Sequence, residues 1–213
     1  MKITTLALSI LSLQLLPFEA FAEEPTKELS FVQGSYVALE LAAANASGTS
    51  EFPILSGGTE TSNFDAGSGR GLNAAIGYNV LRGRYFYGAE FRYSNLIDLS
   101  ERSSSGSENR EVLDVADIRG RFGLIQGNFL YYGALGWSWS RFRVHPSRKF
   151  ENRESQTTID GFNIGVGLEY NFSERWFIGG EYSYRDLSGK FEEANDETSI
   201  DLGLLSARVG FRF

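Results

Sequence analysis

The single histidine of the chain, His145, stands two residues before Ser147 and is the first candidate for chemistry. Side chains two residues apart in an extended strand point to the same side, so a histidine base in this position can reach a serine nucleophile. Pro146 lies between them, and the carboxylate that orients the base would have to be Glu151 or Glu154 in the same polar stretch. The spacing is compatible with acyl transfer, and the alternative is an ordinary loop histidine.

A second set of candidates consists of charged residues that recur at alternating positions. The negative members are Glu40, Glu90, Asp117, Glu169 and Glu181, and the positive members are Arg92, Arg119, Arg121, Arg185, Arg208 and Arg212. If these residues share an enclosed face they must be paired, because an uncompensated buried ion costs several kcal/mol. The near balance of charge predicts an ion-pair network that either holds strands together or exchanges partners to open a narrow path.

The elements that must position these residues are eight segments with a period of two, which is the period of a β-strand. They cover about 35–45, 68–81, 84–97, 112–125, 128–144, 160–172, 175–187 and 200–213. The sixth segment is the most regular: Phe162, Ile164 and Val166 alternate with small or polar residues such as Asn163 and Gly165.

The size of the side chains on the two faces indicates how these strands close. Eight strands enclose a lumen just wide enough to be filled by side chains. The apolar faces, crowded with Trp, Tyr and Phe, are too large to fit inside, whereas the faces rich in Gly, Ser, Ala and paired charges would fit. The aromatics also cluster toward both strand ends, as in the two girdles of a membrane barrel. We therefore predict an all-β, eight-stranded, antiparallel up-and-down transmembrane barrel, with a secreted β-sandwich as the alternative.

The N-terminal residues have the pattern of an export signal. Lys2 precedes the apolar stretch 3–16, and Ala20-Phe21-Ala22 forms a small-residue cleavage site. We expect a signal peptide over 1–22 and one barrel domain over 23–213. In the latter, no apolar run is long enough for a transmembrane helix.

The predicted connections alternate in length. Tight turns lie at 81–84, 126–127 and 173–174, and longer polar segments at 46–67, 98–111, 145–159 and 188–199. An even number of strands places both termini on the short-turn side, which is periplasmic in such barrels, so the four long loops should be extracellular.

Composition narrows the range of functions. The formal net charge is −7, which disfavours nucleic acid as a partner because binding phosphates requires a basic surface. The chain has no cysteine, which excludes a disulfide scaffold, thiol catalysis and a cysteine-ligated metal. We expect no cofactor and no metal site.

The C-terminal strand ends in alternating Val209, Phe211 and Phe213 and resembles the signal that outer-membrane barrels present to their insertion machinery. The opening Gly34-Ser35-Tyr36-Val37 is similar to that of opacity-type barrels. The chain as a whole resembles the small eight-stranded outer-membrane barrels: the OmpA transmembrane domain, OmpX and Ail, and the opacity-type surface proteins.

This resemblance implies a monomeric, non-enzymatic protein of the Gram-negative outer membrane that supports membrane integrity or contacts a host or other extracellular ligand. Its partners would be outer-membrane lipid, lipopolysaccharide and the insertion machinery. The first alternative is a narrow gated channel, in which Glu/Arg pairs exchange as proposed for the OmpA domain. The second is a lipid A-modifying enzyme, because His145-Pro146-Ser147 has the His-x-Ser spacing of a lipid A deacylase barrel.

Overall fold

The computed structural model describes residues 30–53, 58–97, 99, 109–145, 155–191 and 196–213. The predicted signal peptide therefore lies outside the described residues. A short 3-10 helix, η1 (Ser30–Val32), precedes eight strands. The strands are β1 (Gly34–Pro53), β2 (Thr59–Arg82), β3 (Tyr85–Ile97), β4 (Asn109–Gln126), β5 (Phe129–His145), β6 (Ser155–Asn171), β7 (Trp176–Phe191) and β8 (Asp196–Arg212).

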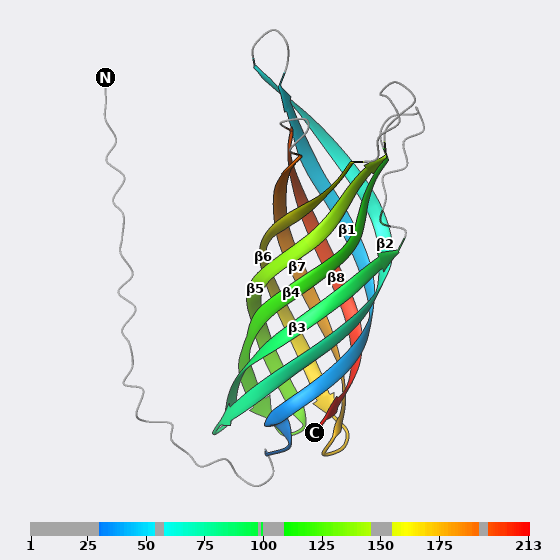
Figure 1. Ribbon diagram of the computed structural model, residues 1–213. Coiled ribbons are helices and arrows are strands. Elements are labelled where there is room, and N and C mark those ends of the chain that lie inside the picture. The colour runs from blue at the N-terminus through cyan, green and yellow to red at the C-terminus, as the bar shows by residue number, and fades with distance from the viewer. Residues whose placement is uncertain (1–29, 54–57, 98, 100–108, 146–154, 192–195) are drawn as a thin grey trace, which may run out of the picture.

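The strands form one closed barrel in chain order. Each strand pairs antiparallel with the next, and β1 pairs with β8, so the sheet has no free edge around the ring. Figure 1 shows the tilted strands winding around a common axis. The prediction of an eight-stranded antiparallel barrel is confirmed.

Tight turns join the strands at one end of the barrel, which we call the short-turn end. Arg82 pairs with Tyr85 and Gln126 pairs with Phe129, which leaves two residues in each turn. Gly83 and Gly127 have φ values of 61° and 58°, a left-handed conformation that glycine adopts without strain. At the third turn, the Ser173 hydroxyl accepts a hydrogen bond of 2.9 Å from the Trp176 backbone N–H.

The strands are longer than predicted at the opposite, long-loop end. In place of one loop over 46–67, β1 continues to Pro53 and β2 begins at Thr59, and the two stay paired throughout. Strands β6, β7 and β8 also extend into the predicted loops. These extensions are rich in Ser, Thr and charged residues and lack the apolar alternation on which the prediction rested. A strand with water on its outer face does not need that alternation.

A β-bulge accompanies the extension of the first hairpin. The register shifts between Ala46 and Ser47, where Ala66 is the extra residue of β2. Gly67 has φ 73°, and its N–H donates to Asp65 Oδ1 at 2.8 Å. Such a bulge bends the hairpin and increases its twist. In Figure 1 the β1–β2 hairpin rises well above the end of β3.

The outer surface is apolar and the interior is charged. Leu41 and Val166 on the outside are 71% and 62% exposed, whereas Arg92 and Asp117 inside are fully buried. A soluble barrel has the reverse arrangement. The orientation predicted from the side-chain sizes is therefore the observed one.

The inward-facing side chains form three layers along the barrel axis. On β4, for example, the order from the long-loop end is Val115, then Asp117, Arg119 and Arg121, then Ile125. The apolar cluster at the long-loop end contains Ala42, Ala44, Ala46, Phe64, Leu96, Leu99, Val112, Val115, Phe142, Ile159, Leu187, Ile200, Leu202 and Leu204. A smaller cluster at the short-turn end contains Val32, Leu81, Phe86, Ile125, Leu130 and Tyr132. The charges thus lie between an apolar layer with residues from all eight strands and a smaller apolar cluster on η1 and β2 to β5, beside which Asn171 and Arg212 are also buried.

Four inward-facing aromatic rings near the short-turn end follow one rule. Each lies on an odd-numbered strand directly opposite a glycine of the next strand. The pairs are Tyr36 with Gly77, Phe86 with Gly123, Tyr132 with Gly167, and Phe177 with Gly210. A Cβ atom on any of these glycines would overlap the opposing ring. The glycines therefore provide the space in which the rings lie against the barrel wall.

Candidate functional site

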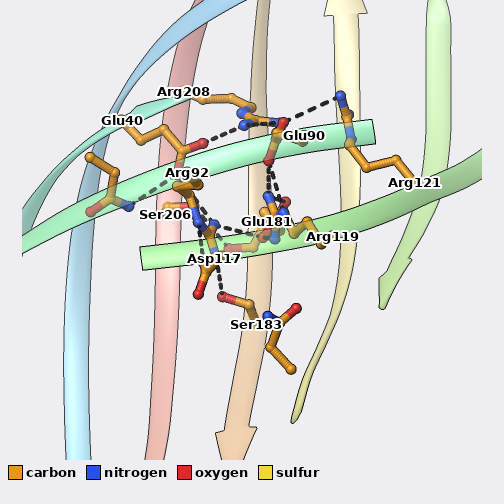
Figure 2. Close-up of polar contacts among 12 residues, drawn as sticks. Glu40, Glu90, Arg92, Asp117, Arg119, Arg121, Glu181, Ser183, Ser206 and Arg208 are labelled. Carbon is orange, nitrogen blue, oxygen red and sulfur yellow. Dashed lines mark hydrogen bonds and ion pairs between the residues drawn. The ribbon is translucent and has the colours of Figure 1, made fainter. Parts of the chain in front are cut away.

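All eleven charged residues predicted to share the enclosed face lie inside the barrel, and none is more than 3% exposed. Strands β1, β3, β4, β6, β7 and β8 supply them. Figure 2 shows the side chains of eight of them pointing toward one another, namely Glu40, Glu90, Arg92, Asp117, Arg119, Arg121, Glu181 and Arg208. Each joins at least one ion pair with another member of the set. We call this set the luminal charge network.

Arg92 of β3 lies at the centre of the network. Its Nε donates to Asp117 Oδ2 at 2.9 Å, and its Nη1 donates to Glu181 Oε1 at 2.8 Å. The same Nη1 is 3.5 Å from Glu40 Oε2. One guanidinium thus connects β3 to β4, β7 and β1 across the lumen.

Two further arginines connect the remaining carboxylates. Arg119 donates from Nε to Glu90 Oε1 and from Nη2 to Glu181 Oε2, both at 2.8 Å. Arg208 donates from Nη2 to Glu90 Oε2 at 3.0 Å and is also paired with Glu40. Charged hydrogen bonds of this kind are about twice as strong as neutral ones. Because the carboxylates are shared, no single pair can move without disturbing others.

Asp117 and Arg185 form the part of the network nearest the long-loop end. Arg185 donates from Nη2 to Asp117 Oδ2 at 2.6 Å and from Nε to Oδ1 at 3.1 Å, which is a bidentate contact. The Ser138 hydroxyl donates to the same carboxylate at 2.7 Å, and Ser183 accepts from Arg185 Nη1 at 3.2 Å. Asp117 therefore accepts hydrogen bonds from donors on three other strands, namely Arg92 of β3, Ser138 of β5 and Arg185 of β7.

Glu169 lies in the part of the network nearest the short-turn end and is shared by three arginines. Arg208 Nη1 donates to its Oε1 at 3.1 Å and Arg212 Nη2 to its Oε2 at 2.7 Å, and Arg121 is paired with Oε1. Aromatic rings cover two of these cations: the Arg121 Cζ is 4.0 Å from the Tyr132 ring centroid, and the Arg212 Cζ is 4.0 Å from that of Phe177. Cation–π contacts add to the ion pairs here.

Two phenols, those of Tyr36 and Tyr132, also belong to the site, although they are not among the predicted site residues. Tyr36 Oη donates to Glu90 Oε2 at 2.6 Å and accepts from Arg121. Tyr132 Oη donates to Glu181 Oε2 at 2.8 Å and accepts from Arg208 Nη1 at 3.1 Å. The signal was present, because both tyrosines occur on the small, polar face of their strands. A large aromatic on that face indicates a ring inside the lumen.

The aromatic girdle toward the long-loop end has polar partners on the outside of the barrel. Tyr93 Oη donates to Asp114 Oδ2 at 2.7 Å, and Arg141 Nε contacts the same carboxylate at 2.9 Å. Trp137 Nε1 donates to Asp160 Oδ2 at 2.8 Å. Aromatic side chains with an apolar body and a hydrogen-bonded tip are typical of a membrane–water interface.

The residues of the predicted insertion signal end the barrel on its outer face. The Phe213 N–H donates to the Ser35 carbonyl at 3.0 Å, and its side chain is 75% exposed. The ring centroid of Phe211 lies 5.1 Å from that of Trp176 and 5.4 Å from that of Phe213. Both phenylalanines thus belong to one aromatic cluster, in which Phe213 and Trp176 are exposed and Phe211 is half-buried.

The predicted catalytic pair cannot be assembled from the described residues. His145 ends β5 with its backbone paired to Asn109, whereas Ser147, Glu151 and Glu154 lie outside the described residues. In the described part of the chain, no three His, Cys, Asp or Glu side chains are grouped to hold a metal ion. The same residues include no helix long and apolar enough to cross a membrane.

Comparisons with known proteins agree with this geometry. Neisserial surface protein A is 16% identical with a TM-score of 0.53, and the match covers 85% of this chain and 98% of that one. OprG from Pseudomonas aeruginosa is 14% identical with a TM-score of 0.51, covering 85% and 96%. The Escherichia coli outer membrane protease OmpT is 8% identical with a TM-score of 0.51, covering 85% and 97%. At these identities the likeness shows the fold alone.

No curated protein sequence matches the chain. A family model described as the outer membrane protein beta-barrel domain, however, matches residues 4–213. The closed barrel of this chain, with its apolar outer face and charged interior, has the arrangement typical of outer-membrane barrels. The chain therefore belongs to the outer membrane protein β-barrel domain family.

Proposed function

We propose that the protein is a non-conducting, non-enzymatic surface protein, which reinforces the outer membrane and contacts an extracellular ligand through its long-loop end. The observation that carries this proposal is the filling of the lumen. The luminal charge network is closed at the long-loop end by an apolar layer with residues from all eight strands, so the described interior offers ions no continuous polar path. Any contact with a lipid or a ligand must then be made by the outer surface and the loops.

In the alternative, a narrow gated channel, an exchange of ion-pair partners would not by itself open a path through the barrel. The apolar layer at the long-loop end would also have to part, including the stacked rings of Phe64 and Phe142, whose centroids are 6.3 Å apart. Protein interiors packed in this way change between discrete arrangements and do not deform continuously. This favours a structural role for the ion pairs.

We infer that the short turns and both termini are periplasmic and that the long loops are extracellular. Short periplasmic turns and longer extracellular loops are the rule for these barrels. The tall β1–β2 hairpin then becomes the most prominent described feature on the cell surface. Its outer residues include Glu51, Asp65 and several Ser, Thr and Asn side chains. Such a polar, acidic hairpin is suited to contacts in water.

Three partners follow from this placement. The aromatic girdles and apolar outer face would contact outer-membrane lipid and lipopolysaccharide, and the C-terminal Phe213 would be read by the insertion machinery during assembly. We propose a monomer, because the barrel closes on itself without a second chain. An extracellular or host ligand would bind at the long-loop end.

The proposal is tested in cells that display either the wild-type protein or a variant in which residues 48–63 are replaced by a two-residue turn. The shortened variant keeps the luminal charge network and so should still form a heat-modifiable barrel. We expect it to lose adhesion to cultured host cells while resistance to detergent is retained. If the shortened variant adheres as well as the wild type, the β1–β2 hairpin is not the ligand-binding part of the protein.

A further inference from the structure

We propose that a small monovalent inorganic anion, such as chloride, binds inside the lumen beside Glu169. The residues around it are Arg121, Arg208 and Arg212. The inference does not depend on what the long loops contact, because it concerns only the enclosed interior. Two independent observations lead to the same place.

The first observation is the charge balance. Six guanidinium groups and five carboxylates are enclosed together, and none of these residues is more than 3% exposed. The described lumen therefore holds one positive charge in excess. Because these groups are buried, bulk water screens that charge only weakly, and an uncompensated buried charge costs several kcal/mol. A bound anion would remove that cost.

The second observation is that three of the six luminal arginines have an Nε–H group without a hydrogen-bond acceptor among the described residues. Arg92 and Arg185 direct Nε–H to Asp117, and Arg119 directs its Nε–H to Glu90. The other three luminal arginines are Arg121, Arg208 and Arg212. Their buried Nε–H groups have no acceptor among the described residues. A buried donor without an acceptor costs about 1–3 kcal/mol.

Both observations meet at Glu169. The three arginines with unpaired Nε–H groups are the same three that share this one carboxylate. Arg212 has no other carboxylate partner among the described residues. Arg208 also pairs with Glu40 and Glu90, and Arg121 Nη1 lies 3.5 Å from Glu90 Oε2. We therefore assign the excess positive charge to Arg212, whose unused Nε–H lies in the part of the network nearest the short-turn end.

The surroundings limit the kind of ligand. A water molecule could satisfy donors but would not balance the charge. The rings of Tyr36, Tyr132 and Phe177 pack around these arginines, which leaves little space for an organic anion. A halide ion carries the required negative charge and, as a single atom, is small enough for the limited space. Because Arg212 ends β8 and pairs with Tyr36 near the start of β1, the site lies close to the short-turn end of the barrel.

The test is thermal unfolding of the refolded, full-length barrel in detergent micelles, with sodium chloride exchanged for sodium gluconate at constant ionic strength. Above saturation, we expect the wild-type midpoint to rise by about 3–5 °C for each tenfold increase in chloride. Arg212→Gln removes the excess charge and should abolish this dependence. Arg84→Gln, at an exposed arginine of the short-turn end, is the matched control and should retain it.

A midpoint for the wild type that is the same in chloride and gluconate would overturn the proposal. Equal chloride dependence in Arg212→Gln and wild type would also overturn it, because the effect would then arise elsewhere. A second measurement does not depend on any variant. Crystals of wild-type protein refolded in sodium bromide should show an anomalous bromide peak between the three arginines, and bromide peaks confined to the outer surface would contradict the site.

Discussion

Arg92→Met is the substitution that tests most sharply whether the luminal charge network holds the barrel together. Arg92 contacts Asp117 at 2.9 Å, Glu181 at 2.8 Å and Glu40 at 3.5 Å, all fully enclosed. Breaking a buried ion pair by removing one partner costs about 3–5 kcal/mol. Each of the three carboxylates keeps one other arginine, namely Arg185, Arg119 or Arg208. We therefore expect a loss near the lower limit, about 3 kcal/mol.

The free energy of unfolding would be measured by urea titration in detergent micelles, followed by the fluorescence of the three tryptophans. For a barrel of this size the loss corresponds to a fall in the thermal midpoint of about 6–12 °C. Arg143→Met is the matched control. Arg143 is 3.9 Å from Glu111, and both side chains are about one-third exposed, so this change should cost no more than about 1 kcal/mol. If Arg92→Met is as stable as Arg143→Met, the network does not stabilise the barrel.

Two further substitutions examine other parts of the barrel. Gly210→Ala places a Cβ against the Phe177 ring and should destabilise the barrel by about 1–3 kcal/mol in the same urea titration, whereas Gly180→Ala, where a Cβ meets only the Ser206 carbonyl at 3.6 Å, should not. An unchanged Gly210→Ala would show that the ring does not need the glycine. Deletion of Phe213 should lower the amount of assembled barrel in membranes several-fold without preventing refolding in detergent, whereas Phe172→Ala, another exposed aromatic, should assemble normally. Equal assembly of both variants would contradict an insertion signal at Phe213.

The sequence predicted the strands where one face meets lipid. There the alternation is strong, because every second side chain must be apolar, and the eight segments correspond to the observed strands. At the long-loop end water replaces lipid on the outer face and that requirement disappears. The residues from Ser47 to Pro53 and from Thr59 to Asp65 therefore looked like loop, although they pair in register.

Alternation also identified which charged side chains point inward, but it carries no information about depth along the axis. The apolar layer at the long-loop end was missed for this reason. One local signal was available: in β8, Leu204 faces inward while Leu205 faces outward, so the strand is apolar on both faces at that height. Consecutive leucines in an otherwise alternating strand indicate an apolar interior layer as well as an apolar exterior.

The pairing of each inward-facing aromatic ring with a glycine could not be predicted from the alternation of residues within one strand. Whether Tyr36 meets Gly77, or Tyr132 meets Gly167, depends on the register between strands. Strand register is determined by the turns and by the closure of the whole barrel, and not by either strand alone. The contacts of the luminal charge network depend on register in the same way.

The most direct test of the closed lumen is electrical. Purified wild-type protein and the variants Glu90→Lys and Glu181→Lys would be inserted into planar lipid bilayers, and single-channel currents recorded across a range of voltages. If the apolar layer at the long-loop end closes the barrel, the wild type should show no current steps, and the two charge reversals should lower stability without opening a steady conductance. Reproducible ohmic channels in the wild type, altered by either charge reversal, would contradict the closed barrel and establish a gated path through the luminal charge network.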